Sequence, residues 1–254
     1  MRKVNILTII GIIFAICVAI IFFYLGVQAR TSGISIFHSR YIIKGKLFGE
    51  SADIRDFVAL KYNITEEAKN LKEDTELATV IKTYNFVEEG YKYTVDNLTL
   101  LNGIKVLLKG GADSWNPAWL SLAIKHQNGG LDGDCEDVTS LIVALSRANG
   151  INIWQNIGTI TLNSGIYGHS WGTVIIDGTE YLLEGTREAP LTELKTIDQV
   201  YKDAKAMNQM LKYEASIKFN EKDVLTTVGA DLNKELPPQL PPSKLQELKD
   251  ALGD

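Results

Sequence analysis

Residues 133–137 read Gly-Asp-Cys-Glu-Asp, and this short stretch decides how the rest of the chain is interpreted. Beyond Cys135 the apolar residues recur at helical spacing until an Asn-Gly pair that starts at Asn149. The pattern predicts a helix that begins at the cysteine and ends at that pair. Asp132 and Asp134 stand where N-cap acceptors are expected. The sequence therefore places a thiol at a helix N-terminus, where negative charge on sulfur is favoured.

A histidine and a glutamate downstream fall on two predicted strands joined by a tight turn. The turn is Asp177-Gly178, a pair that favours a two-residue type I′ hairpin. In that register His169 and Glu184 are diagonal neighbours on one sheet face, about 7–8 Å apart at the backbone. A three-residue turn would put them on opposite faces. The register pairs Ile176 with Thr179, Val174 with Tyr181 and Trp171 with Glu184, and it predicts a core face made of Val174, Ile176, Tyr181 and Leu183.

A lone thiol, an imidazole and a carboxylate in this order are typical of nucleophilic catalysis at an acyl carbon. Cys135 is the candidate nucleophile, His169 the candidate general base, and Glu184 the candidate partner that orients the imidazole. The alternative for the cysteine is a buried, inert thiol. The other histidines, His38 and His126, lack a carboxylate or strand context and are interpreted as structural or surface residues.

At these residues the sequence resembles the transglutaminase-like superfamily of papain-like cysteine hydrolases. The family pattern is a Gly-Asp-Cys-Glu-Asp helix start, then Gly-His-x-Trp, matched by residues 168–171, then a strand reading roughly Trp/Tyr-x-Leu-Asp-Pro-Thr, matched by residues 181–186. The similarity runs from about residue 74 to residue 186. It implies an α+β, papain-like core with helices packed on an antiparallel sheet. The chain departs from the pattern at Glu184, where the family usually has Asp, and at Gly185, where Pro is common.

The acids around Cys135 raise the question of a metal. Bacterial transglutaminase-like cysteine proteinases, which the motif resembles, use the acids that flank their cysteine to bind calcium, and these map to Asp134 and Glu136. A calcium ion would offset the negative charge that opposes thiolate formation. The alternative is that solvated acids cap the helix and complement its dipole. No other cofactor is expected.

An oxyanion hole needs the backbone N–H of Cys135 and one more donor, and Trp115, Gln127 and Asn128 are candidate sources.

The first 29 residues are interpreted as a membrane anchor. Residues 6–25 form an uncharged, nearly unbroken apolar run, long enough to cross a bilayer core about 30 Å thick. A cleaved signal peptide is the alternative, although its apolar region usually spans only about 7–15 residues. Basic residues on the two sides of the run are nearly balanced, and the short basic N-terminus favours a catalytic domain on the extracytoplasmic side.

The remaining chain is divided into a juxtamembrane segment (30–52), a transglutaminase-like domain (53–234) and a Pro-rich linker with a C-terminal tail (235–254). Within the domain, helices are expected from residue 65, over 74–89, from Asn116-Pro117 to Gly129-Gly130 and over 190–211, and strands over 151–161, 171–177, 179–184 and 215–219. Leu77, Val80, Ile81, Tyr84 and Val87 are expected to form a core-facing stripe.

Charge and cysteine content limit the partners and the chemistry. Without residues 1–29 the chain carries 24 basic and 31 acidic residues, which argues against nucleic acid as a partner. Cys17 lies in the apolar run, so Cys135 is the single cysteine of the domain, and neither a disulfide nor a zinc cysteine pair is expected there.

The sequence predicts a membrane-anchored cysteine hydrolase that acts on peptide or glutamine-type amide bonds of a protein or peptide substrate. Hydrolysis is favoured over cross-linking, because nothing in the sequence indicates a site that excludes water. One alternative is a non-catalytic binding or assembly module of the cell envelope that kept the fold. Another is an envelope component that acts through its Pro-rich tail.

Overall fold

The computed structural model describes residues 35–36, 42–44, 51–94, 115–227 and 237–253. The predicted anchor, residues 1–29, and most of the predicted juxtamembrane segment lie outside these ranges. Within them no helix is both long and apolar enough to cross a membrane.

Helices dominate the first half of the described domain and strands the second. The helices are η1 (Ile54–Val58, a 3-10 helix), α2 (Tyr62–Leu71), α3 (Glu76–Glu88), α5 (Ala118–Asn128), α6 (Cys135–Ala148), α7 (Ile197–Ala206), η2 (Pro242–Lys244, also 3-10) and α8 (Leu245–Leu252). The strands are β1 (Ser35–Ile36), β2 (Ile42–Lys44), β3 (Ser51–Asp53), β4 (Lys92–Tyr93), β5 (Asp132–Gly133), β6 (Ile153–Leu162), β7 (Gly165–Ile176), β8 (Thr179–Leu183), β9 (Lys195–Thr196), β10 (Leu211–Phe219) and β11 (Val224–Thr226).

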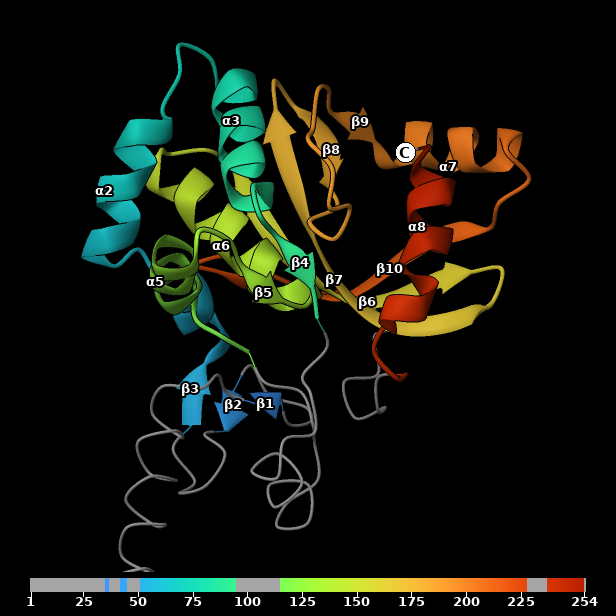
Figure 1. Ribbon diagram of the computed structural model, residues 1–254, viewed down its shortest axis with the longest axis horizontal. Helices are drawn as coiled ribbons and strands as arrows, with labels where there is room; N and C mark the ends of the chain where they lie inside the picture. Colours follow the sequence, from blue (N-terminus) through green and yellow to red (C-terminus); the bar gives the residue numbers. More distant parts are fainter. Residues whose placement is uncertain (1–34, 37–41, 45–50, 95–114, 228–236, 254) are drawn as a thin grey trace, which may run out of the picture.

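The main sheet has the strand order β11-β10-β6-β7-β8-β9, and each neighbouring pair is antiparallel. Figure 1 shows α2, α3, α5 and α6 on one side of this sheet and α7 and α8 on the other. Two small sheets complete the described part, β1-β2-β3 and the parallel pair β4-β5. The predicted α+β class, with helices packed on an antiparallel sheet, is therefore confirmed.

Helix α6 is the centre of the domain. Every residue from Cys135 to Ser146 is buried, so the helix has no solvent-facing side over most of its length. It packs against α2, α3 and α5 and lies on β6 and β7. The predicted start at Cys135 and end at Asn149 are confirmed, with Asn149 as the C-cap. A helix that is surrounded on all sides holds its first residue at a fixed place relative to the sheet.

The hairpin of β7 and β8 has the predicted register. Asp177 and Gly178 both have positive φ angles, 50° and 76°, as a type I′ turn requires. Val174 pairs with Tyr181, Ile176 pairs with Thr179, and Gly172 pairs with Leu183 at the far end of β8. Strand β7 begins at Gly165, six residues before the predicted start, so His169 lies inside a strand that pairs with β6.

The predicted core faces need two corrections. On β7 and β8, Val174 and Leu183 are buried as predicted, whereas Ile176 and Tyr181 are only half-buried. On α3, Leu77 is 43% exposed, because it lies in the first turn of a helix that starts at Glu76 and not at Asp74. The side chain of Thr75 caps this helix by accepting from the backbone N–H of Ala78.

Other predicted helix boundaries also move. Helix α2 begins three residues earlier than predicted, at Tyr62. Pro117 is the N-cap of α5 and not its first residue, and Gly129 ends that helix in the left-handed conformation. The expected helix over 190–211 is wrong at both ends, since α7 spans only Ile197–Ala206 and Leu211 already belongs to β10. A capping box made by Thr196 and Gln199 fixes the true start of α7.

The Pro-rich tail packs into the domain, which corrects its interpretation as a linker. Leu240 is fully buried, and the buried face of α8 consists of Leu245, Leu248, Ala251 and Leu252. The Tyr93 hydroxyl donates a hydrogen bond of 2.6 Å to the carbonyl of Leu240. Residues 237–253 are thus part of the same hydrophobic core as the helices and the sheet.

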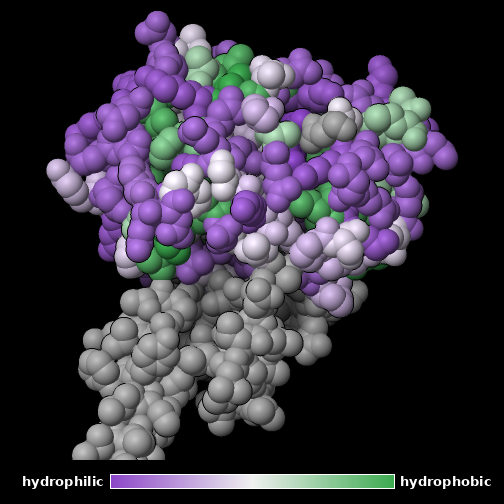
Figure 2. All heavy atoms as spheres, viewed as in Figure 1, coloured by the Kyte–Doolittle hydropathy of each residue, from purple (hydrophilic) through white to green (hydrophobic). Residues whose placement is uncertain are grey.

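The face of the domain seen in Figure 2 is mostly hydrophilic, and its apolar side chains gather only in small, separate patches. This surface agrees with the acidic composition of the domain.

Candidate active site

Cys135 is the first residue of α6, and the residues around it explain the motif. The first N–H groups of a helix have no intrahelical partner, so the sulfur lies beside free backbone donors. A Cβ at Gly133 would lie 2.7 Å from an oxygen of Asp137, so only glycine fits there. The Asp137 carboxylate accepts two hydrogen bonds from Asn116, of 2.8 Å from its backbone N–H and 3.0 Å from its side-chain nitrogen. This acid ties the segment before α5 to the start of α6.

The predicted capping by two acids is wrong. Asp134 occupies the N-cap position of α6, but its side chain makes no capping hydrogen bond. Asp132 lies in β5, three residues before the first residue of the helix, and its backbone pairs with Lys92.

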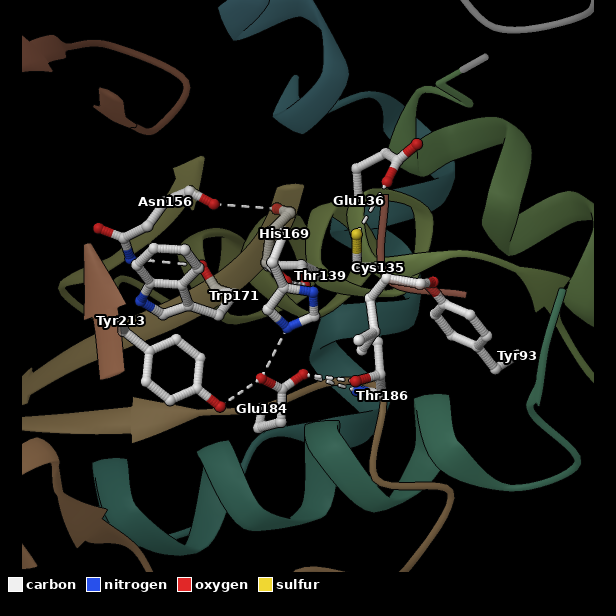
Figure 3. A network of polar contacts seen from close by, with 12 residues as sticks. Tyr93, Cys135, Glu136, Thr139, Asn156, His169, Trp171, Glu184, Thr186 and Tyr213 are labelled. Carbon is white, nitrogen blue, oxygen red and sulfur yellow. Dashed lines mark hydrogen bonds and ion pairs between the residues drawn. The ribbon is translucent and has the colours of Figure 1, made fainter. Parts of the chain in front are cut away.

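His169 lies between the thiol and a carboxylate (Figure 3). Its Nε2 is 2.8 Å from Oε2 of Glu184, and its Nδ1 points toward the sulfur of Cys135. Nδ1 has no hydrogen-bond partner of normal geometry among the described residues. The imidazole packs against the rings of Trp171 and Tyr213, each with a centroid distance of 6.2 Å. One ring nitrogen is thus committed to the carboxylate, and the other faces the thiol.

Glu184 is held by a full set of donors. Its Oε2 also accepts from the Tyr213 hydroxyl at 2.8 Å, and its Oε1 accepts from the hydroxyl and the backbone N–H of Thr186 at 2.7 and 3.1 Å. The side chain is 1% exposed. A carboxylate with this many donors is costly to protonate and cannot turn away from the imidazole. Tyr213 and Thr186 are supporting residues that the sequence analysis did not identify.

The pair of His169 and Glu184 is charged at neutral pH. Burial alone would lower the pKa of His169, but the neighbouring charges of Glu184 and Cys135 and the hydrogen bond to Glu184 outweigh it and raise that pKa to about 10. Burial alone would likewise raise the pKa of Glu184, but the imidazolium and the donors from Thr186 and Tyr213 lower it. The imidazole therefore carries a proton at physiological pH.

A polar network fixes the distance between the helix and the sheet at this point. Gln155 of β6 accepts from the Ser140 hydroxyl of α6 at 2.9 Å and donates to the Ser170 hydroxyl of β7 at 3.0 Å. Its amide also donates to the carbonyl of Glu136 at 3.3 Å. Because Ser170 follows His169, this buried glutamine joins the helix that carries the thiol to the strand that carries the imidazole.

A second acid and the C-terminal tail lie on the other side of the sulfur. The thiol donates to Oε2 of Glu136 at 3.1 Å. The side-chain nitrogen of Gln239 donates to the same oxygen at 3.3 Å and lies 3.8 Å from the sulfur. Tyr93 is beside Cys135 in the same view (Figure 3). The sequence analysis gave no sign of Gln239, which lies in the tail interpreted as a linker.

The remaining candidates lie elsewhere. His126 of α5 has a 54% exposed side chain and lies 3.2 Å from a carboxylate oxygen of Glu67. Trp115 is buried among aromatic rings and stacks against Phe219. Gln127 and Asn128, two candidate oxyanion donors, are exposed at the end of α5. His38 lies outside the described residues.

The described residues hold no ready-made cluster of metal ligands beside Cys135. Calcium takes 6–8 oxygen ligands, whereas the described residues contain no group of three or more His, Cys, Asp or Glu side chains arranged to hold a metal. Oε2 of Glu136 already accepts hydrogen bonds from a thiol and an amide. Calcium binding at Asp134 and Glu136 therefore stays a prediction of the sequence, and no chemical step is derived from it.

Melting curves test calcium binding at Asp134 and Glu136 directly. We expect the curves of the full chain with added calcium and with a chelator to overlap. A ligand that does not bind the native state leaves the melting temperature unchanged. A rise of the melting temperature in calcium that Asp134→Asn removes would contradict this expectation and restore the metal site.

Comparisons with known proteins add little to this geometry. No protein-family model and no curated protein matches the chain. One similar solved structure is described as a putative cysteine protease from Cytophaga hutchinsonii, with 18% sequence identity and a TM-score of 0.37. The match covers 73% of this chain and 58% of that chain, so the protein spans little more than half of the length of that structure.

Proposed function

We propose that the protein is a cysteine hydrolase of the transglutaminase-like kind, which cleaves peptide or glutamine-type amide bonds through an acyl-enzyme on Cys135. One observation carries the proposal: the imidazole of His169 faces the thiol with Nδ1 and holds Glu184 with Nε2 at 2.8 Å. Protonated His169 supports this reading further, because a thiol attacks as the thiolate and an imidazolium stabilises it.

The proposed reaction uses each of the three groups in turn. The sulfur of Cys135 attacks the carbonyl carbon, and His169 gives its proton to the departing amine. His169 then takes a proton from water, which attacks the thioester and releases the acid. Glu184 keeps the imidazole oriented and stabilises its charged form throughout. Membrane anchoring through residues 6–25, an extracytoplasmic domain and a protein or peptide substrate remain parts of the proposal that rest on the sequence.

A thiol-directed activity probe tests the proposal. The full chain should be labelled at Cys135, and Cys135→Ala should remove that label. Equal labelling of the wild type and Cys135→Ala would reject the proposal that the protein is a cysteine hydrolase. A wild-type chain that is folded but not labelled at Cys135 would favour the alternative, a non-catalytic binding module of the cell envelope.

Glu184→Gln should lower the rate and shift its dependence on pH. The variant loses the charge that raises the pKa of His169, so the imidazolium should lose its proton at a lower pH than in the wild type. We expect the rate to fall by orders of magnitude and the alkaline limb of the kcat/KM profile to move to lower pH. Glu184→Asp, which keeps the charge, should retain more activity.

The control for this prediction is Glu67→Gln, which removes the carboxylate beside His126 and should leave the profile unchanged. An alkaline limb at the same pH in Glu184→Gln and the wild type would remove Glu184 from the site.

A further inference from the structure

The tail reaches the candidate active site along β7. The backbone N–H of Gly168 donates to the carbonyl of Pro238 at 2.9 Å, and the N–H of Leu240 donates to the carbonyl of Gly168 at 3.2 Å. These two bonds form a parallel bridge between Gly168 and Gln239. Gly168 directly precedes His169. The backbone of Gln239 is therefore fixed beside the strand that carries the imidazole, and its side chain extends to the sulfur of Cys135.

The orientation of the Gln239 amide is set by its neighbour. Oε2 of Glu136 lies 3.3 Å from the side-chain nitrogen of Gln239 and accepts its hydrogen bond. A carboxylate can only accept, so the amide turns its NH2 group, and not its oxygen, toward the site. The nitrogen lies 3.8 Å from the sulfur. The amide has two N–H groups: one donates to Glu136, and the other donates to the sulfur of Cys135, beside which an oxyanion would form.

We propose that Gln239 is the second oxyanion donor of the reaction, together with the backbone N–H of Cys135. This inference rests on the proposed function. When the thiolate attacks, a bond forms between sulfur and the carbonyl carbon, and the π electrons of the carbonyl move to its oxygen. Collapse restores the carbonyl and expels the amine, which takes the proton of His169. The oxyanion lies beside the sulfur, where donors at about 2.7–3.1 Å from it stabilise the transition state most.

Two observations argue that the tail is a permanent part of the site and not a removable strap that imitates a substrate. A bound substrate would present its carbonyl carbon to the sulfur, whereas Gln239 presents its nitrogen. The tail is also anchored directly after the bridge, by buried Leu240 and by the packed helix α8. Displacing it would expose this apolar surface to water.

Two reactions of the full chain separate the oxyanion role from other effects. The first is acylation by 4-nitrophenyl acetate, which passes through an oxyanion. The second is thiol–disulfide exchange with 2,2′-dipyridyl disulfide, in which the thiolate attacks sulfur and no oxyanion forms. The rate due to Cys135 is the rate of the wild type minus the rate of Cys135→Ala. We expect Gln239→Ala to acylate about 10²–10³-fold more slowly than the wild type, while its exchange rate stays within about threefold.

Matched variants make the result specific. Gln246→Ala removes a glutamine of the same tail whose amide donates to Asp250 on the surface of α8, and it should match the wild type in both reactions. Gln239→Glu keeps the shape of the side chain and has no donor when ionised, so it should acylate as slowly as Gln239→Ala. If Gln239→Ala fails to fold, as judged by circular dichroism, Gln239→Glu and Gln239→Asn take its place.

The outcomes differ for the two proposals. Acylation by Gln239→Ala at the wild-type rate would overturn the donor role and leave the proposed function standing. Faster acylation would also overturn it and would mark the tail as an inhibitory strap. An equal loss in both reactions would show that Gln239 acts on the thiolate and not on the oxyanion. A folded wild type that neither acylates nor labels at Cys135 would reject the proposed function, and the donor role with it.

Discussion

Cys135→Ala should abolish amide hydrolysis and probe labelling while the fold stays intact. The side chain supplies the only thiol of the described residues, and without it no acyl-enzyme can form. The change removes one atom from a site that is already 3% exposed, so the loss of packing is small. Hydrolysis rates, circular dichroism and melting curves of the two proteins measure this. Turnover of Cys135→Ala at the wild-type rate would end the enzyme hypothesis.

His169→Ala should lose nearly as much activity, and unlike Cys135→Ala it should also lose stability. The imidazole is the ion-pair partner of Glu184, and both side chains are buried, at 0% and 1% exposure. Removing one member of a buried ion pair leaves an unpaired charge, which typically costs about 3–5 kcal/mol. The rate and the free energy of unfolding should therefore fall together in this variant.

The matched control is His126→Ala, because His126 lies on the surface of α5 and pairs with Glu67 of α2. It should keep the activity and nearly all of the stability, since exposed ion pairs contribute about 0–1 kcal/mol. The double variant of Cys135 and His169 should be no slower than Cys135→Ala, because residues that act as one catalytic unit are not additive. A double variant that is much slower than either single one would mean that the two residues act independently.

The sequence predicts the parts of the fold that depend on neighbouring residues. A turn of two residues sets the register of its own hairpin, so the pairing of Val174 with Tyr181 follows from Asp177-Gly178 alone. The register then brings His169 and Glu184 onto one face, where they form a hydrogen bond of 2.8 Å. The start of α6 at Cys135 follows in the same way from helical spacing and an Asn-Gly stop.

The features that escaped the sequence analysis depend on contacts between distant segments. Gln239 lies 104 residues from Cys135 along the chain, and the Pro-rich stretch around it resembles an extended linker because such segments have no internal hydrogen bonds. Tyr213 lies 29 residues from Glu184 and donates to it only because β10 packs beside β6. The early start of β7 has a different cause, since its first residues pair with the end of β6, the strand directly before it in the chain.

The formation of an acyl-enzyme on Cys135 is tested most directly by mass spectrometry of the full chain after brief mixing with 4-nitrophenyl acetate and acid quenching. An acyl-enzyme mechanism predicts one acetyl group, located by peptide mapping on Cys135, that disappears as the ester is consumed and is absent from Cys135→Ala. His169→Ala should carry far less of it at the same time point. An acetyl group on another residue, or continued turnover with no acyl group on Cys135, would contradict the central role of this cysteine.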